Sequence, residues 1–235
     1  MTAGWRAHLA LHYTRDGERT IALDRHEGPL RVLQRLYPEG PGICHHVIVH
    51  PPGGIVGGDE LHVDVRVDAG AHALLTTPGA TRFYRSAGAR ALQQVRLQVG
   101  ADARLEWLPL ETLVYDGALA RNRQCFVLGD GAEMIGWDLL ALGLPAAGED
   151  FDRGSFAQHL EMPGVWLEHG TIHGSGITNE PRDGATHMFC ARATSELATR
   201  TRALGFEPSA TATLLATPTI ADELRTTDFV LTSAI

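Results

Sequence analysis

The chain has 235 residues, 44% of them hydrophobic, which is enough to bury a core, so a single domain over residues 1–235 is expected. Its formal net charge is -8 and it contains no lysine. Because phosphate binding needs clustered cations, a nucleic-acid surface is not expected. The three cysteines share no C-x-x-C spacing, and there is neither a basic-then-apolar leader nor a run of about 18 apolar residues. These features predict a cytoplasmic protein without a membrane span, a disulfide framework or a structural zinc site.

Segments of alternating apolar residues, typical of β-strands, recur along the chain and are joined by turns of small residues. The expected strands are 43–50, 61–67, 71–77, 91–99, 103–108, 124–128 and 132–140. Turns at 68–71, 100–103 and 129–132 each end in an alanine, and these alanines are 32 and 29 residues apart. Such near-regular spacing predicts stacked β-coils or a meander, and periodicity alone does not separate these from a sandwich.

A glycine-rich segment follows the first expected strand. Pro51 and Pro52 end that strand because neither residue can donate to a β-ladder. Glycines then occupy four of the next six positions, followed by Asp59 and Glu60. A phosphate loop would need a lysine and a hydroxyl residue there, and the spacing does not fit a dinucleotide fingerprint. The favoured interpretation is a tight structural turn, with ligand contact as the alternative.

Helices are expected to be scarce and to lie near the C-terminus. The best candidate spans 194–204, with hydroxyl residues at its start and Gly205 at its end. A weaker candidate follows Pro218, across 220–225. One or two short helices are therefore expected on a β-rich fold.

The strand expected at 43–50 raises the question of a metal site, because it carries three histidines. Alternation places Cys44, His46 and His50 on one face and His45 on the other. His46 and His50 would be roughly 13 Å apart along a strand, too far to share one ion unaided. One open alternative is a β-rich metal-dependent enzyme of the cupin type, built on these histidines and a carboxylate.

Two further groups have both a functional and a structural interpretation. Glu106 and Glu111 are paired carboxylates of the kind used in glycoside hydrolysis, but nothing places them across a cleft. Arg82, Tyr84 and Arg85 have the composition of an interface hot spot, so they are candidate partner-binding residues, with simple packing as the alternative.

Several short motifs occur in a distinctive order between about residues 4 and 170. They include His50-Pro51-Pro52-Gly53-Gly54, Gly57-Gly58-Asp59, Thr76-Thr77-Pro78-Gly79-Ala80-Thr81, Phe83-Tyr84-Arg85-Ser86, Leu105-Glu106-Trp107-Leu108-Pro109, Asp116-Gly117-Ala118 and Trp137-Asp138. In order and spacing they resemble the UreD family of urease accessory proteins, called UreH in some lineages.

This resemblance implies an all-β, right-handed β-helix-like stack of short strands. It implies a urease maturation factor that is not an enzyme. Such a scaffold would bind apo-urease and accessory proteins of the UreF and UreG types, the latter a GTPase, and would relay nickel to the urease active site. Nickel would be in transit, with no cofactor tightly bound, because carboxylates, carbonyls and water release an ion more readily than a thiolate cage does.

The resemblance also implies an internal water-filled tunnel through which nickel passes. Positions that match its lining are Asp59, Thr81, Asp138 and Glu168, and the resemblance favours His50 among the histidines. Each carboxylate has a structural alternative: a turn cap at Asp59, an ion pair between Asp138 and Arg123, and solvent exposure of Glu168.

A conduit that forms only in a complex should expose an apolar patch when the protein is alone. Ile55 and Val56, at the tip of the glycine turn, are the residues expected to form part of it. They are therefore candidate partner-binding residues as well.

The chain departs from the family pattern in places. Leu144 stands where an arginine is usual, and Arg82 stands where lysine is common. The last 65 residues match poorly and lack the basic, tryptophan-bearing segment expected of the family, so contacts made by that segment are open here. A stand-alone structural or binding protein with inert glycine loops is a third interpretation.

Overall fold

The computed structural model of the chain describes residues 4–144, 147–174, 185–191 and 212–215. Within these ranges the strands form two sheets, and there is no α-helix. The first sheet contains β14 (Trp166–His173), β13 (Ser155–Met162), β11 (Leu119–Leu128), β8 (Ala91–Val99), β5 (Glu60–Val67), β1 (Arg6–Asp16) and β2 (Arg19–Glu27), in that order. The second contains β16 (Ala212–Leu215), β15 (Ala185–Ala191), β12 (Glu133–Leu142), β9 (Arg104–Leu108), β6 (His72–Thr76), β4 (Ile43–Val49) and β3 (Arg31–Val32), with the short β7 (Thr81–Phe83) and β10 (Thr112–Val114) beside this row.

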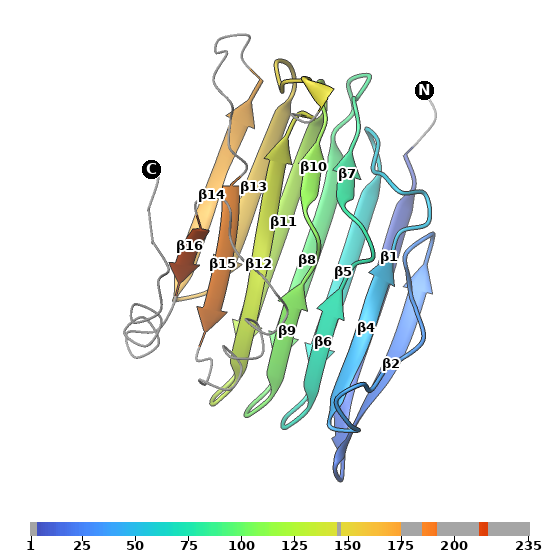
Figure 1. Cartoon of the computed structure of the whole chain (residues 1–235), viewed down its shortest axis with the longest axis vertical. Helices are drawn as coiled ribbons and strands as arrows, with labels where there is room; N and C mark the ends of the chain where they lie inside the picture. The colour runs from blue at the N-terminus through green and yellow to red at the C-terminus, as the bar shows by residue number, and fades with distance from the viewer. Residues whose placement is uncertain (1–3, 145–146, 175–184, 192–211, 216–235) are drawn as a thin grey trace.

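The chain winds as a β-solenoid of about four turns (Figure 1). Strands β1, β5, β8, β11 and β13 pair in parallel in the first sheet, and β4, β6, β9 and β12 do so in the second. The predicted all-β stack of coils is therefore confirmed, whereas its right-handed sense stays a prediction. The helices predicted at 194–204 and 220–225 lie outside the described residues.

Stacked alanines explain the repeat that the sequence shows. Ala71, Ala103 and Ala132 are buried at the tight turn of successive coils. The N–H of Arg104 donates to the carbonyl of Ala71, and the N–H of Glu133 donates to that of Ala103, each at 2.9 Å. Because each turn rests directly on the backbone of the previous one, only small residues fit there.

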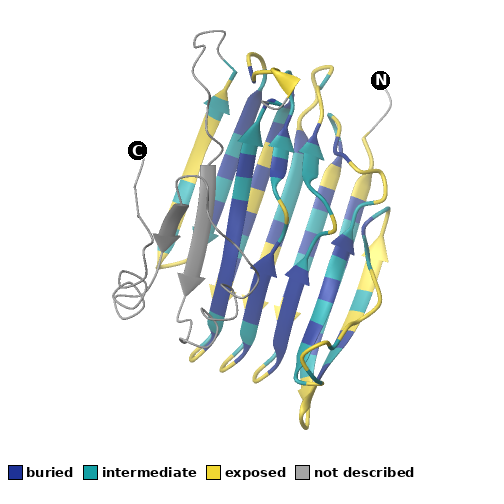
Figure 2. Cartoon of the chain, in the orientation of Figure 1, coloured by how far each residue is buried: buried dark blue, intermediate teal, exposed yellow. Residues whose placement is uncertain are grey.

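The hydrophobic core fills the space between the two sheets, where every second residue of the strands points inward (Figure 2). On β5 the inward residues are Leu61, Val63, Val65 and Val67, as alternation predicts. On β4 Cys44 and His46 share one face, as predicted, and that face points inward. The strand ends before Pro51, so the interpretation of the proline pair as a strand stop is confirmed.

Nine strands were not predicted, namely β1, β2, β3, β7, β10, β13, β14, β15 and β16, and neither was the first part of β11. The pairs β1–β2 and β13–β14 form the two ends of the first sheet, so that β2 and β14 each have a neighbouring strand on one side only among the described strands. Their outward positions include Ala10 and Leu23, which blur the alternation. Strand β11 begins at Leu119, whereas the predicted strand began at 124. The prediction missed the first part of the strand because its inward residues, Ala120 and Asn122, are not large and apolar.

Candidate functional site

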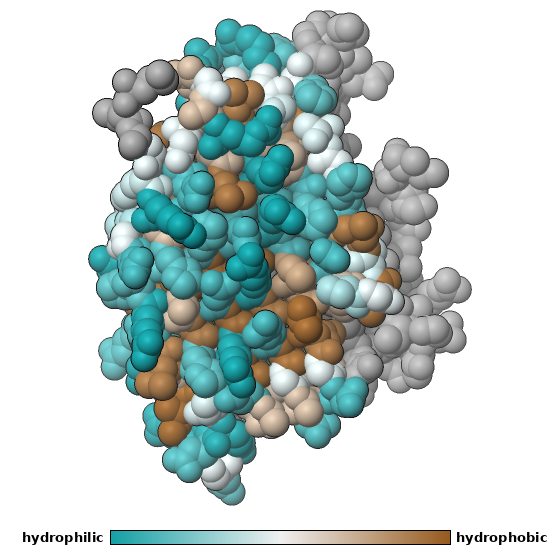
Figure 3. Space-filling model, turned by 180° about the vertical axis from the view of Figure 1, so that it is seen from behind, coloured by the Kyte–Doolittle hydropathy of each residue, from teal (hydrophilic) through white to brown (hydrophobic). Residues whose placement is uncertain are grey.

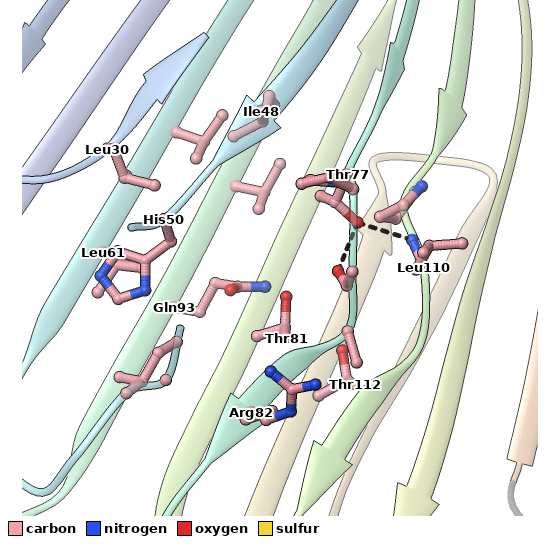
Figure 4. Close-up of a pocket in the computed structure, with 18 of the residues that line it drawn as sticks. Leu30, Ile48, His50, Leu61, Thr77, Thr81, Arg82, Gln93, Leu110 and Thr112 are labelled. Carbon is pink, nitrogen blue, oxygen red and sulfur yellow. Dashed lines mark hydrogen bonds between the residues drawn. The ribbon is translucent and has the colours of Figure 1, made fainter. Parts of the chain in front are cut away.

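A cavity of about 250 Å³ lies between the two sheets (Figure 4). Its lining comes from the inner faces of both sheets and from the loop that precedes β7; the polar lining residues include His50, Thr81, Gln93, Thr112, Gln124 and Asp138. Pro78 and Leu110 also line it and are exposed, so the cavity reaches the surface beside them. Its position in the core makes it the best candidate for a functional site.

The mouth of the cavity is held by hydrogen bonds between two loops. The hydroxyl of Thr77 donates to the carbonyl of Gly79 at 3.0 Å and accepts the N–H of Leu110 at 2.9 Å (Figure 4). The N–H of Thr81 donates to the carbonyl of Glu111 at 2.9 Å. These contacts tie the segment before β7 to the segment before β10, so the mouth has a defined shape.

His50 contributes an imidazole to the lining of the cavity. Its Nε2 is buried and has no hydrogen-bond partner among the described residues, and its ring lies 5.7 Å from that of Trp5. Burial lowers the pKa of His50, and the charge of Asp59 opposes the shift only in part. The imidazole is therefore neutral at pH 7, the form that binds a metal ion.

Asp138 is the cavity's buried carboxylate and is held by amide groups. Its side chain accepts hydrogen bonds from Gln124 at 2.9 Å and from Gln158 at 2.7 Å. Arg123 is exposed on the outer face of β11, so the predicted ion pair between Asp138 and Arg123 is wrong. Sequence reasoning did not place β11 opposite β12 across the core, so it did not identify Gln124 and Gln158 as the partners of Asp138.

A row of amides continues from the cavity along the inner face of the first sheet. Gln93, Asn122 and Gln158 lie side by side on β8, β11 and β13. The amide of Gln93 donates to Asn122 at 3.4 Å, while Nδ2 of Asn122 and Oε1 of Gln158 are buried with no partner in the part of the chain that the structure describes. Buried polar atoms of this kind are costly unless water or an ion meets them. Sequence reasoning missed this row, although the inward parity of Gln93 within 91–99 was a usable signal.

Asp59 and Glu168 are not among the residues that line the cavity. Asp59 is buried and accepts the N–H groups of Val56 at 3.0 Å and Trp5 at 3.3 Å, so it does serve as the turn cap of the structural alternative. Glu168 is half-buried on β14, the edge strand, and faces inward opposite Leu160. The cavity thus brings together His50, Thr81 and Asp138.

The glycine turn does not expose Ile55. Its side chain is 1% exposed, because its backbone pairs with β7 through bonds to Arg82 at 2.7 Å and Tyr84 at 2.9 Å. The expectation of an exposed apolar pair is therefore wrong for Ile55 and correct for Val56, which is 46% exposed. Tyr84 is also exposed and stacks on Tyr115, with the ring centroids 5.1 Å apart.

The histidines of β4 do not form the ligand set that a cupin-type enzyme requires. His45 points out of the second sheet and bonds Glu39 at 2.8 Å, whereas His46 points inward and bonds the hydroxyl of Tyr13 at 2.6 Å. Over the described ranges, no group of three or more His, Cys, Asp and Glu side chains is placed to hold a metal ion.

In the same described ranges, no helix has the length and hydropathy to cross a membrane.

Comparison with protein families decides the assignment. The model of the UreD urease accessory protein family matches residues 5–225. The chain belongs to the UreD family. The resemblance noted in the sequence is thereby confirmed.

Curated UreD family members are similar over most of this chain. The urease accessory protein UreD of Leptothrix cholodnii is 64% identical over 170 residues, which is 72% of this chain and 61% of the relative. That of Polaromonas sp. is 61% identical over 189 residues, 80% of this chain and 68% of the relative. The chain therefore spans about three fifths of the length of the Leptothrix protein.

Proposed function

We propose that this UreD family member is a non-catalytic scaffold of urease maturation, working in the cytoplasm, and that its interior relays nickel to apo-urease. The observation that carries the proposal is the cavity, which is lined by one neutral imidazole, one carboxylate, two side-chain amides and the guanidinium of Arg82, without a closed ligand cage among the described residues. Imidazole and carboxylate both suit nickel(II), and an incomplete set of ligands favours release.

The nickel path would run along the solenoid, from coil to coil. His50, Thr81 and Asp138 lie in the cavity, and the amides of Asn122 and Gln158 continue the polar lining. Glu168 lies on β14, two strands beyond β11, which is roughly 10 Å at the usual strand spacing. Asp59 lies at the opposite end of the path, near Trp5. In this proposal Asp59 and Glu168 act at the ends of the path and Asp138 acts in its middle.

The partners of this scaffold would be apo-urease and accessory proteins of the UreF and UreG types. One contact surface would be formed by Val56, Arg82, Tyr84 and Arg85, because Val56, Tyr84 and Arg85 are exposed and Arg82 lines the cavity. Aromatic residues and arginine are enriched in such interfaces. Ile55 would contribute indirectly, by fixing the backbone under Tyr84.

The test is complementation of a urease operon that lacks its own UreD-type gene. The nickel content of the purified urease is measured with the wild-type chain, with Asp138→Asn and with the control Asp130→Asn in an exposed turn. We expect Asp138→Asn to lower nickel loading at least five-fold while the protein folds and still co-purifies with its partners. Failure of the wild-type chain to restore loading would overturn the function, and normal loading by Asp138→Asn would overturn the path.

A further inference from the structure

The outer face of the first sheet carries two arginines that form no ion pair with any carboxylate of the described residues. Arg121 and Arg123 are exposed on β11, and neither has a partner among the described residues. They lie near the middle of the seven-stranded sheet, next to β8 and β13. Figure 3 shows this face with polar side chains over much of it and apolar side chains gathered in its lower part.

The acidic residues that strands β5 and β13 place on this face are already engaged. Asp64 contacts His8 at 2.7 Å and Arg96 at 3.9 Å. Glu161 contacts His159 at 3.1 Å. Likewise, Glu60 lies 3.3 Å from His62 and 4.0 Å from Arg6. In a chain with a formal net charge of -8, the part of this face formed by β5, β8, β11 and β13 therefore offers guanidinium groups, rather than carboxylates, that are unpaired among the described residues.

We propose that the outer face of the first sheet, centred on Arg121 and Arg123, docks a carboxylate-bearing surface of a partner protein. Guanidinium groups bind carboxylates through paired hydrogen bonds, and unpaired exposed ones can do so without first breaking an internal contact. This inference deepens the proposed function, because it gives the chemistry of one partner surface, and it rests on that function only for the partner's identity.

The dimensions of the face suit a protein interface. Seven strands spaced about 4.8 Å apart are roughly 29 Å wide, and eight residues along a strand are about 26 Å long. The resulting area of roughly 750 Å² is close to the ~800 Å² that each partner contributes to a standard interface.

Exposed apolar residues on this face favour a protein over a nucleic acid. Val127 of β11 is 45% exposed and Leu167 of β14 is 59% exposed, and both point outward from the first sheet. A nucleic-acid surface would need cations without interspersed acidic groups, whereas Asp64 and Glu161 lie within this face. Arginine beside apolar residues is typical of protein interfaces.

The experiment uses a labelled peptide of ten glutamates as the probe and a peptide of ten glutamines as its neutral match. Binding to the full chain is measured at low and high salt, because exposed charges are screened by salt. The variant is Arg121→Glu/Arg123→Glu. The control is Arg15→Glu, which changes another exposed arginine, one that donates hydrogen bonds to the carbonyls of Gly17 and Gly42. Melting temperatures confirm that the variants fold.

We expect the glutamate peptide to bind and the glutamine peptide not to bind. The affinity for the glutamate peptide should be at least ten-fold lower at high salt and at least ten-fold lower in the double variant. In Arg15→Glu the affinity should stay near normal. Equal binding by the double variant and the control would overturn the proposal. Tighter binding of a duplex DNA probe than of the glutamate peptide would also overturn the proposal. Self-association that the double variant abolishes would overturn it as well, because the face would then bind a second copy of the chain.

The double variant is then compared with Asp138→Asn in the operon assay. We expect the double variant to lose co-purification of one urease or accessory subunit, which Asp138→Asn retains. Loss of glutamate-peptide binding together with full co-purification of every subunit would overturn the docking role while leaving the proposed function standing.

Discussion

The hydroxyl of Tyr13 lies 2.6 Å from Nδ1 of His46 and links β1 to β4 across the core. Burial raises the pKa of Tyr13 well above its usual value, so the hydroxyl keeps its proton and donates a hydrogen bond to Nδ1 of the imidazole. Burial, aided by the charge of Arg35 and opposed by Asp24, lowers the pKa of His46 to about 4. The histidine is therefore neutral in the folded protein, and its Nε2 finds no hydrogen-bond partner within residues 4–144, 147–174, 185–191 and 212–215.

This pair predicts a loss of stability in acid. The folded-state pKa of His46 lies below the unfolded value of about 6.5, so the unfolded chain binds more protons as the pH falls below 6.5. Between pH 7.5 and pH 5 we expect this group to lower the free energy of unfolding by about 2 kcal/mol, with the loss complete near pH 4. Urea unfolding at both pH values measures it.

The matched variant is His46→Gln, which can still accept the hydrogen bond of Tyr13 but does not titrate. We expect its stability to change less with pH than that of the wild type, by the same ~2 kcal/mol. An identical pH dependence in the two proteins would show that His46 does not titrate on unfolding as stated.

Asp138→Ala should be destabilising as well as functionally damaging. The substitution leaves the amides of Gln124 and Gln158 without their carboxylate acceptor inside the core. Each buried donor left unsatisfied costs about 1–3 kcal/mol, so we expect a total loss of roughly 2–6 kcal/mol for the two donors. Urea unfolding of Asp138→Ala beside Asp130→Ala, on an exposed turn, measures the difference; a loss below 1 kcal/mol would mean that water replaces the carboxylate.

Gly54→Ala should disturb the exposed surface near the cavity mouth. A Cβ at this position would lie 1.9 Å from the ring of Tyr84, so the ring would have to leave its stack on Tyr115. We expect a stability loss of about 1 kcal/mol and a changed near-ultraviolet signal from the tyrosines. Gly79→Ala is the control, because its Cβ would meet no atom within 4 Å. Equal spectra for the two variants would contradict the packing described here.

Much of the solenoid was predictable from the sequence because its turns repeat. The alanines at 71, 103 and 132 mark the stacked corners, and the strands between them alternate clearly. The end strands β1 and β14 were not predictable in the same way, since their outward faces mix apolar and polar residues. Repetition therefore revealed the middle of the fold better than its ends.

The candidate site was less accessible to sequence reasoning because it depends on contacts between coils. The resemblance to UreD selected Thr81 and Asp138, which the cavity does bring together with His50. The partners of Asp138 are Gln124 and Gln158, and no local pattern pairs these three residues. Burial of Ile55 was missed for the same reason, since its ladder partner is the distant β7.

The central claim, that nickel reaches urease through the cavity, is tested most directly by filling the cavity without removing a charged ligand. Thr81→Trp places a large ring in the lining, and Asp130→Trp is the matched change on an exposed turn. The measurement is nickel per urease active site in complexes isolated with each variant. Our account predicts complexes that form normally but contain urease with little nickel for Thr81→Trp, and full loading for Asp130→Trp; full loading through a filled cavity would contradict it.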